Sequence, residues 1–394
     1  MRSADVVVIG AGVVGCSVAF HLARLGAQRV LVLERRKIGE GTTAQSSGIL
    51  RTHYSVAENV ALARRSWQAF EAFDQYVGDA QASAGLVRCG YLIVAPEGQA
   101  QAALAASLQQ QRDMGIEVQT LTAQQAQQRL PIAQFDDAEL IGWEPQAGFA
   151  DAYLVATGFA RASRRLGVCI DEGVAVQGLQ VHQGRVTGVH TDQGVVHTER
   201  VISTQNIWAQ ELQAWTGVSC PLVSERHRVL ALSGPKPYTP DMPVFKDLVS
   251  RGMLYARSYG GQHMLVSEGT PGEVLPQPDD TQGDIPLDFV ADVGEQVAQR
   301  FADYAEAGLA SSWTGVYDVT PDWNPVLGPW PGLAGLVVGL GFSGHGFKLS
   351  PAVGQVLAQS ALELPTEVSL APYAMERFAR GQLLRGRYGQ GAVS

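Results

Sequence analysis

The chain of 394 residues contains few basic residues and no basic cluster. Its 29 Lys and Arg are outnumbered by 38 Asp and Glu, which gives a net charge of −9, and the arginines near the C-terminus are sparse. Because a surface that follows a phosphate backbone needs clustered Lys and Arg, the composition argues against nucleic acid as a partner. With 46% apolar and 17% charged residues, it is typical of a soluble globular protein.

Cysteine is scarce, and the one long uncharged segment is not a helix pattern. The four cysteines are far apart and form no C-x-x-C, which argues against a zinc site or a disulfide framework and fits a reducing compartment. Residues 325–347 carry no charge, but ten of these 23 residues are Gly or Pro, which interrupt a helix. The N-terminus shows no signal-peptide pattern. We therefore expect no membrane span and a cytoplasmic protein.

The first apolar segment ends in a glycine-rich turn. Residues 6–9 (VVVI) have the continuous apolar character of a parallel strand buried on both faces. Gly10, Gly12 and Gly15 follow in the pattern G-x-G-x-x-G and lead into a helix-like segment. In such a turn the first glycine bends the chain, the second admits a pyrophosphate, and the third lets the helix pack closely on the strand. The amides at the start of the helix, including those of Val13 and Val14, then face the phosphates.

A second apolar run, residues 30–33, ends at Glu34, where a carboxylate is expected to accept hydrogen bonds from the adenosine ribose. An ordinary glycine-rich turn is the alternative interpretation. The register of strand, glycines and acid favours a dinucleotide site. The pattern does not separate FAD from NAD. A polar, glycine-rich loop, residues 39–48, and a helical pattern from Ala57 follow instead of a further strand. A plain surface loop explains that composition equally well.

Several segments of the chain resemble the flavoprotein family that includes sarcosine oxidase, glycine oxidase and dimethylglycine dehydrogenase. The resemblance begins at Glu34-Arg35 with GEGTTAQSSG and spans nearly the whole sequence. The other matching segments are residues 142–167, 171–176, 201–212, 312–329 and GLGFSGHGFKLSP near the C-terminus. Asn206 stands where the 201–212 motif usually has a glycine, which puts close backbone packing there in doubt. The resemblance implies FAD as the cofactor.

The C-terminal segment GLGFSG is also a literal G-x-G-x-x-G behind an apolar run. A second dinucleotide site would need a helix beginning inside it and an acid ending a later strand. Instead, Ser350-Pro351 resembles a helix start, with Ser as the N-cap and Pro in the first turn, and the residues near 360 belong to that helix. We therefore expect one dinucleotide site. The resemblance implies that the S-G-H-G-F-K loop lies against the flavin ring, so that electrons come from a bound substrate.

The resemblance also assigns the binding residues. We expect these residues to hold FAD: Gly10, Gly12, Val13, Val14, Gly15, Glu34, Arg35, Thr42, Thr43, Ser46, Ser47, Gly48, Val174, Gly344, His345, Gly346 and Lys348. Lys348 and Arg51 are expected to hold a substrate carboxylate, since a guanidinium fork and an ammonium suit that group. For Arg51 a phosphate or surface contact is the alternative. His345 either tunes the amine or the flavin or is structural, and Arg257 is either a second carboxylate ligand or a solvated strand residue.

Three positions depart from the family pattern. Monomeric sarcosine oxidases attach flavin through a cysteine where this chain has Gly315, and dimethylglycine dehydrogenase types use a histidine where it has Gln45. We therefore expect non-covalent FAD. A lysine that the resemblance associates with the reaction of O2 is replaced by Leu265. This favours a dehydrogenase with another electron carrier over an O2-using oxidase, and leaves both open. His53, Tyr54 and Tyr255 are weaker candidates without an assigned role.

The predicted fold is α/β, with a Rossmann-type FAD-binding domain into which a mainly antiparallel β-sheet substrate domain is inserted. We expect the FAD-binding domain in residues 1–85, 145–215 and 310–394, and the substrate-binding domain in residues 86–144 and 216–309. Strands are expected near residues 88–97, 228–234 and 252–269, and a helix near residues 98–115.

The predicted activity is FAD-dependent oxidation of an amino acid or N-alkylated amino acid, whether sarcosine-like, proline-like or a D-amino acid. Hydride passes from a C–H bond to flavin N5, and the resulting imine is hydrolysed. The alternatives are a 2-hydroxy acid dehydrogenase, a β-type catalytic subunit of a heteromeric amine or proline dehydrogenase, and a flavin-binding interaction protein without catalysis. The sequence leaves open a homo-oligomer, and it does not choose among these assemblies.

Overall fold

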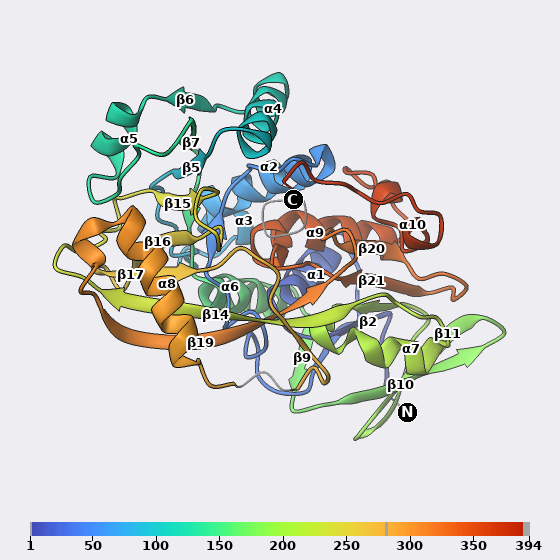
Figure 1. Cartoon of the computed structure of the whole chain (residues 1–394). Helices are drawn as coiled ribbons and strands as arrows, with labels where there is room; N and C mark the ends of the chain where they lie inside the picture. The colour runs from blue at the N-terminus through green and yellow to red at the C-terminus, as the bar shows by residue number, and fades with distance from the viewer. Residues whose placement is uncertain (1, 280–282, 389–394) are drawn as a thin grey trace.

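The buried strand expected after the N-terminus lies in the middle of the central sheet of a computed structural model that describes residues 2–279 and 283–388 (Figure 1). Neighbouring strands of this sheet run parallel, except that the edge strand β20 is antiparallel to β21. The strand order is β20 (Val326–Pro329), β21 (Leu336–Leu340), β13 (Val201–Ser203), β2 (Val6–Ile9), β3 (Val30–Glu34) and β9 (Cys169–Glu172).

The central sheet is covered on both faces, which explains the unbroken apolar run of β2. Val6 and Val8 pack toward helices, whereas Val7 and Ile9 pack toward an antiparallel flanking sheet. The helices are α1 (Val13–Arg24), α2 (Ala57–Glu71), α3 (Phe73–Val77), α6 (Ala152–Arg165) and α9 (Gly346–Ala361). The flanking layer consists of β10 (Val176–His182), β11 (Arg185–Thr191), β12 (Gly194–His197), the short parallel strand β1 (Arg2–Ser3) and helix α7 (Gln210–Thr216).

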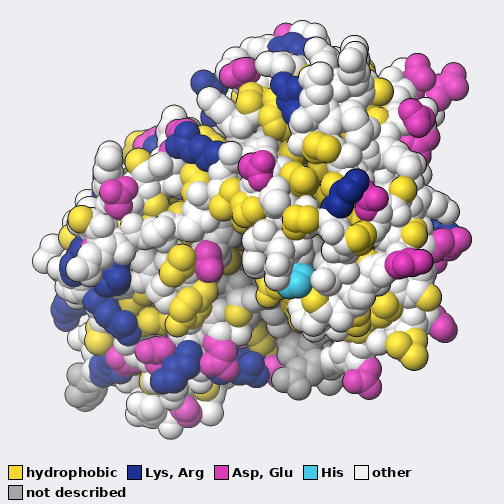
Figure 2. Space-filling model, turned by 90° about the vertical axis from the view of Figure 1, so that its left-hand side faces the viewer, with side chains coloured by type: hydrophobic (Ala, Val, Ile, Leu, Met, Phe, Trp, Pro, Cys, Tyr) yellow, Lys and Arg dark blue, Asp and Glu magenta, His cyan; other side chains and the backbone are white. Residues whose placement is uncertain are grey.

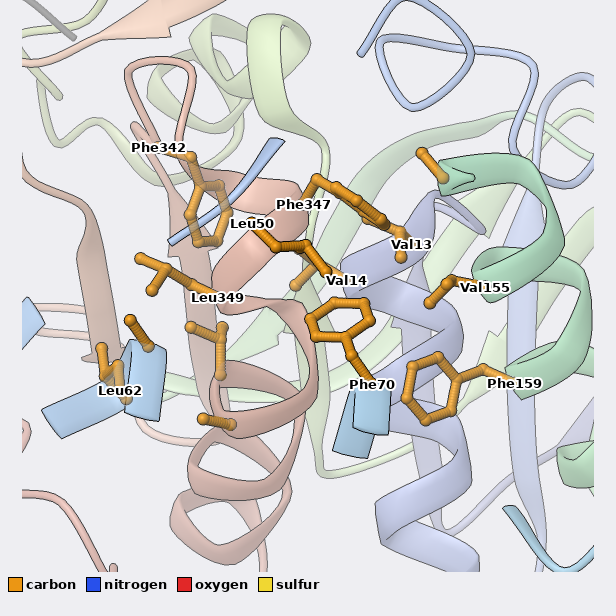
Figure 3. Packing of buried hydrophobic residues seen from close by; sticks show 14 of the residues in the cluster. Val13, Val14, Leu50, Leu62, Phe70, Val155, Phe159, Phe342, Phe347 and Leu349 are labelled. Atoms are coloured by element: carbon orange, nitrogen blue, oxygen red, sulfur yellow. The ribbon is translucent and has the colours of Figure 1, made fainter. Parts of the chain in front are cut away.

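The helical core lies directly beneath the glycine-rich turn. Figure 3 shows Phe347 of α9 close to Val13 and Val14 of α1, with Phe70 of α2 and Phe159 of α6 below them. The rings of Phe70 and Phe347 meet edge to face, with their centroids 5.4 Å apart. Apolar packing therefore fixes the start of α1 against the start of α9, although the two helices are more than 300 residues apart in sequence.

A second, large sheet is antiparallel except where β15 runs parallel to β5. The order is β18 (Glu273–Leu275), β14 (Val223–Ser233), β17 (His263–Ser267), β16 (Tyr255–Tyr259), β15 (Val244–Asp247), β5 (Tyr91–Ala95), β7 (Leu140–Glu144) and β6 (Gln119–Leu121), with β19 (Gly308–Val319) paired to β14. Helices α4 (Gln99–Asp113), α5 (Ala123–Arg129) and α8 (Leu287–Arg300) accompany it. These strands and α4 confirm the elements expected from the sequence.

The two faces of the large sheet differ in chemistry. One face is apolar, and its Phe245, Ala256 and Met264 pack with Val293 and Val297 of α8. Because side chains alternate along a strand, the other face carries the intervening residues. Among them are the polar and aromatic residues Tyr91, Glu144, Lys246, Tyr255 and Arg257. A buried face that displays charge is a candidate binding surface.

The α/β fold class, with a Rossmann-type unit and a mainly antiparallel sheet, is confirmed. The division into two domains at the expected residues stays a prediction. β19 lies mostly in the segment assigned to FAD binding, yet pairs with β14 of the large sheet over its whole length. The remaining short elements are β4 (Ile49–Leu50), β8 (Gly148–Phe149), α10 (Glu376–Ala379) and the 3-10 turns Asn206–Ala209, Ala302–Tyr304 and Ala371–Tyr373.

The face of the molecule in Figure 2 carries no broad patch of side chains with the same charge. Acidic and basic side chains are interspersed there, among scattered apolar ones. Among the helices in the described part of the chain, none has the length and apolar character that crossing a lipid bilayer requires.

The predicted start of the C-terminal helix at Ser350 is wrong. α9 begins at Gly346, with His345 at the N-cap, so Pro351 lies inside the helix. A proline there interrupts the backbone ladder. Ser66 of α2 binds the backbone on both sides of the proline, because its Oγ donates to the Leu349 carbonyl at 3.1 Å and accepts from the Ala352 amide at 3.2 Å. A neighbouring helix thus supplies hydrogen bonds to the α9 backbone, and the sequence pattern of α9 could not reveal them.

Replacing Ser66 with Ala is expected to lower the free energy of unfolding by about 1–3 kcal/mol, since two buried backbone groups lose their partner. Urea unfolding of the FAD-loaded protein measures this. The matched control is Ser163→Ala, which removes a buried hydroxyl whose partner, the Phe159 carbonyl, lies in its own helix. Equal losses in the two variants would contradict a bridging role for Ser66.

Candidate active site

The glycine-rich turn between β2 and α1 has the geometry that its spacing predicts. Gly10 has a φ of +96°, a conformation that favours glycine. A Cβ on Gly15 would lie 1.9 Å from the Gly10 carbonyl oxygen, so only glycine lets α1 approach the turn. Gly12 is the N-cap of α1 and provides no side-chain cap. The Val13 amide donates to Thr43 Oγ1 at 3.0 Å, which ties the loop of residues 39–48 to the helix start.

Glu34 lies at the end of β3, beside this turn. Its carboxylate accepts from the Ala11 amide at 2.8 Å and from the Arg36 amide at 2.7 Å. These bonds orient the carboxylate at the mouth of the turn, where the ribose of a dinucleotide is expected.

A cavity of about 520 Å³ extends from this turn to β19 and to the loop before α9. Most of the residues expected to hold the cofactor line it. They are Gly10, Gly12, Val13, Val14, Gly15, Glu34, Arg35, Thr42, Thr43, Ser46, Ser47, Val174, Gly344 and Gly346. Gly48, His345 and Lys348 are not in the lining. For all of these residues, the part in cofactor binding stays a prediction. Gly48 serves close packing, since a Cβ there would lie 2.2 Å from the Ala150 carbonyl oxygen.

The sequence did not reveal the aromatic and acidic residues at the β3 end of the cavity, which include Trp208, Trp215 and Glu211. The Arg35 guanidinium lies 4.0 Å from the centre of the Trp208 ring, and both side chains contact Asp279. Asn206, which stands where the resembling family has glycine, keeps the left-handed backbone with a φ of +54°. Asparagine tolerates that conformation, and its Nδ2 donates to Thr42 Oγ1.

The two positions used for covalent attachment in the resembling families lie side by side. A Cβ on Gly315 would be 3.5 Å from the Gln45 Cβ, and both residues line the cavity. Gln45 Oε1 accepts from the Val316 amide at 3.0 Å. Neither residue offers a nucleophilic thiol or imidazole at this point.

A buried carboxylate holds the loop before α9. Asp318 of β19 accepts from the Phe342 amide at 3.0 Å and from the Gly341 amide, and burial raises its pKa to about 7. Gly344 packs against Tyr317, since a Cβ there would lie 2.5 Å from that ring. The second glycine pattern therefore allows close packing between this loop and β19. This packing role agrees with the expectation that the pattern is not a second dinucleotide site.

Arg51 and Lys348 lie close together at the boundary between the loop after β4 and the start of α9. Arg51 is 5% exposed, so it is not a surface contact, and its guanidinium lies 4.4 Å from the centre of the Tyr54 ring. Burial, and after it the Arg51 charge, lower the pKa of Lys348 well below its ordinary value. Within residues 2–279 and 283–388, Lys348 forms no ion pair with a carboxylate.

The large sheet brings a further cation and two tyrosines to this region, which the sequence had not singled out as a group. Lys246 of β15 is 2% exposed and donates to the Met253 carbonyl. Burial, followed by the Arg51 charge, lowers its pKa to about 7. Tyr255 is the cross-strand partner of Lys246, and burial raises the pKa of Tyr317 well above its ordinary value.

The other candidates have defined surroundings. Arg257 is buried and therefore is not a solvated strand residue; its Nε donates to the Ser47 carbonyl at 2.6 Å. Its role as a second carboxylate ligand stays a prediction. His345 is buried, and its ring meets that of Tyr54 edge to face at 5.2 Å. His53 Nε2 lies 2.8 Å from the Tyr388 hydroxyl, and burial lowers its pKa to about 3.

Comparison with known proteins places this geometry among flavoenzymes. Residues 5–360 match the model of the DAO family, described as FAD dependent oxidoreductase. The chain is 27% identical to 4-methylaminobutanoate oxidase (formaldehyde-forming) of Paenarthrobacter nicotinovorans, covering 95% of this chain and 46% of that protein, so it spans about half of that relative. It is 25% identical to sarcosine oxidase subunit beta of Arthrobacter sp over the whole chain and 95% of the relative. The solved structure of L-proline dehydrogenase from P. horikoshii shares the fold, with a TM-score of 0.89 at 24% identity, covering 97% of this chain and 99% of that one.

The pairing of Gln45 with Gly315 predicts that FAD is held without a covalent bond. Acid precipitation of the purified holoprotein is expected to release nearly all of the flavin into the supernatant and to leave a colourless pellet. A yellow pellet whose tryptic peptides carry flavin would contradict this prediction and locate the attachment.

Burial of Asp318 predicts a pH-dependent contribution to stability. The pKa of its carboxyl rises from 3.8 to about 7 on folding, so the folded protein keeps a proton that the unfolded chain has lost between these values. The contribution therefore favours folding below pH 4 and is lost as the pH rises to 7.

Relative to Asp318→Asn, the free energy of unfolding of the wild type should fall by about 1–3 kcal/mol between pH 5 and pH 8. Urea unfolding of both proteins at saturating FAD measures this difference. A difference that stays constant with pH would show that the carboxyl is ionised throughout.

Proposed function

The chain belongs to the family of FAD dependent oxidoreductases, and on this premise we propose that it oxidises an amino acid or an N-alkylated amino acid. The observation that carries the proposal is a pair of neighbouring cations, the buried Arg51 and the half-buried Lys348. Burial and mutual repulsion lower the pKa of Lys348, and within the described residues it has no carboxylate partner. A ligand carboxylate would satisfy both cations, because a guanidinium binds it through two hydrogen bonds and an ammonium adds charge.

The residues around the cavity fit FAD. The Gly10–Gly15 turn leaves room for a pyrophosphate where no Cβ could stand, the uncapped α1 supplies amides, and Glu34 lies at the ribose position. At the other end of the cavity are the Gly344 and Gly346 backbone and the start of α9. When bound, FAD supplies the acceptor for the two electrons and the proton of a hydride.

The protein's own part in the reaction is positioning and desolvation. Arg51 and Lys348 hold the carboxylate, which sets the α-carbon or N-alkyl carbon of the substrate at a fixed distance from them. The amine reacts in its neutral form, and the charge of the two cations disfavours an ammonium beside them. Tyr317 of the large sheet lines the cavity with a neutral hydroxyl, since burial raises its pKa.

The reaction balances with two other reactants, the hydride acceptor that FAD would supply when bound and water. The C–H bond breaks with its electron pair, the nitrogen lone pair forms the C=N bond, and the iminium carries the positive charge. Water then adds to its carbon, and an amine or ammonia leaves with formation of a carbonyl group. The residues around the substrate therefore need to exclude water only until the C–H bond has broken.

The substrate class is sarcosine-like, proline-like or a D-amino acid. The relatives named above support it, because 4-methylaminobutanoate, sarcosine and L-proline all combine a carboxylate with an amine. Leu265, which is buried on β17 opposite Arg257, leaves an apolar residue at the position linked with O2, so we propose an electron carrier other than O2. The similarity to a sarcosine oxidase beta subunit supports a heteromeric assembly.

A 2-hydroxy acid would satisfy the same cation pair, so it remains the second candidate. The two classes differ in their products, since only an amine substrate releases ammonia or an alkylamine. An assay for these products after turnover with proline, N-methyl amino acids, D-amino acids and 2-hydroxy acids separates them.

The first test is an anaerobic titration of the flavin absorbance with those four compound classes. We expect bleaching by one amine class. Arg51→Gln and Lys348→Met should each weaken that substrate's binding by about 10- to 100-fold, because each removes a charge-assisted hydrogen bond. Arg161→Gln and Lys236→Met, at ion pairs with Asp79 and Asp303, are the matched controls. Wild-type affinity in both site variants would overturn carboxylate anchoring, and bleaching by none of the compounds would overturn the substrate class.

A further inference from the structure

The segment that carries Arg51 is fastened to the large sheet through a single carboxylate. Glu144, the last residue of β7, accepts from the Thr52 amide at 2.7 Å, from Thr52 Oγ1 at 2.6 Å and from the His53 amide at 3.0 Å. These donors belong to the two residues that directly follow Arg51. Glu144 is 2% exposed, so the three bonds are made away from water, where they are strong and costly to lose.

The strand register places a second contact beside the first. Tyr91 of β5 is the cross-strand partner of Glu144, so both side chains leave the same face of the sheet. The Tyr91 ring centre lies 5.8 Å from the Arg51 guanidinium, while the Tyr54 ring centre lies 4.4 Å from it. One cross-strand pair therefore contacts Arg51 at its guanidinium and at the backbone that follows it.

The charged and titratable groups that face Glu144 are Arg51, His53, Tyr54 and Tyr91. Burial lowers the pKa of His53 to about 3 and raises those of both tyrosines, so Arg51 is the only one of the four that is charged at neutral pH. Glu144 therefore attracts the Arg51 guanidinium and binds the Thr52 and His53 amides. Both interactions hold the segment near the end of β7.

We propose that Glu144 is a positioning residue that sets the place of Arg51 and thereby makes the site select carboxylates over uncharged ligands of the same shape. The inference rests on the proposed function, because it takes Arg51 as the carboxylate anchor. It goes beyond that function in assigning the selectivity to a residue of the large sheet that does not itself bind the ligand. A carboxylate-binding fork that moves by about 1 Å loses much of its bidentate geometry.

The experiment uses the FAD-loaded protein with acetate as the probe and acetamide as its uncharged isostere, and follows binding through the flavin spectrum and by calorimetry. Glu144→Gln keeps the size and one acceptor oxygen but sets an NH2 group against a backbone donor. We expect acetate affinity to fall about tenfold in this variant, with acetamide affinity unchanged. Arg51→Gln should lose acetate selectivity as well, and the double variant should be no worse than Arg51→Gln alone.

A pH profile adds a measurement that a purely structural role would not affect. Burial raises the pKa of Glu144 to about 7, and its protonated form offers one acceptor fewer. Acetate affinity of the wild type should therefore fall below pH 7 relative to that of Glu144→Gln, whose side chain does not titrate.

The controls separate the possible failures. Asp79→Asn changes a carboxylate that also accepts a backbone amide beside arginines, far from the site, and should leave acetate binding unchanged. If Glu144→Gln fails to fold, Thr52→Val removes only the hydroxyl donor, and a two- to fivefold loss of acetate affinity is expected. Wild-type selectivity in Glu144→Gln, or in Thr52→Val where the former does not fold, would overturn the positioning role. Wild-type selectivity in Arg51→Gln would instead overturn the proposed function.

Discussion

The enclosure of two positive charges next to each other, Arg51 and Lys348, is the constraint to which the rest of the site responds. Buried charges are costly unless they are paired, and two neighbouring cations also repel one another. The depressed pKa of Lys348 expresses both effects. Such an arrangement is stable in a folded protein only because the surrounding packing is extensive. It becomes favourable electrostatically when an anion joins it, which is why we propose it as a binding site for a carboxylate.

Each of the two main sheets contributes one half of this arrangement. The central sheet places the glycine turn, Glu34 and the start of α9 around one cavity, and the contact between Phe70 and Phe347 keeps the helices that frame it together. The large sheet turns its apolar face to α8 and its charged face to the loop that carries Arg51. In the proposed site, cofactor and substrate would therefore meet between the two sheets, and neither sheet alone would form it.

The local parts of this architecture were predictable from the sequence. Strand, turn, helix and acid between residues 6 and 34 follow from short-range rules, and the close packing predicted for Gly15 agrees with its contact with Gly10. Asn206 shows the limit of reading one position alone. Asparagine keeps a left-handed backbone there, although the motif usually has glycine. The start of α9 was not predictable in this way, since the hydroxyl that binds its backbone on both sides of Pro351 comes from Ser66, far away in sequence.

The grouping of residues on the charged face of the large sheet could not be predicted from the sequence, for a related reason. Tyr91, Glu144 and Lys246 become neighbours only through strand register, which depends on pairings between segments that are 50 to 150 residues apart. The most direct measurement is a crystal structure of the FAD-loaded protein with bound acetate. The account predicts the acetate carboxylate within hydrogen-bond distance of both Arg51 and Lys348, with Glu144 still bonded to Thr52 and His53. Acetate bound elsewhere, with either cation turned away from it, would contradict the account.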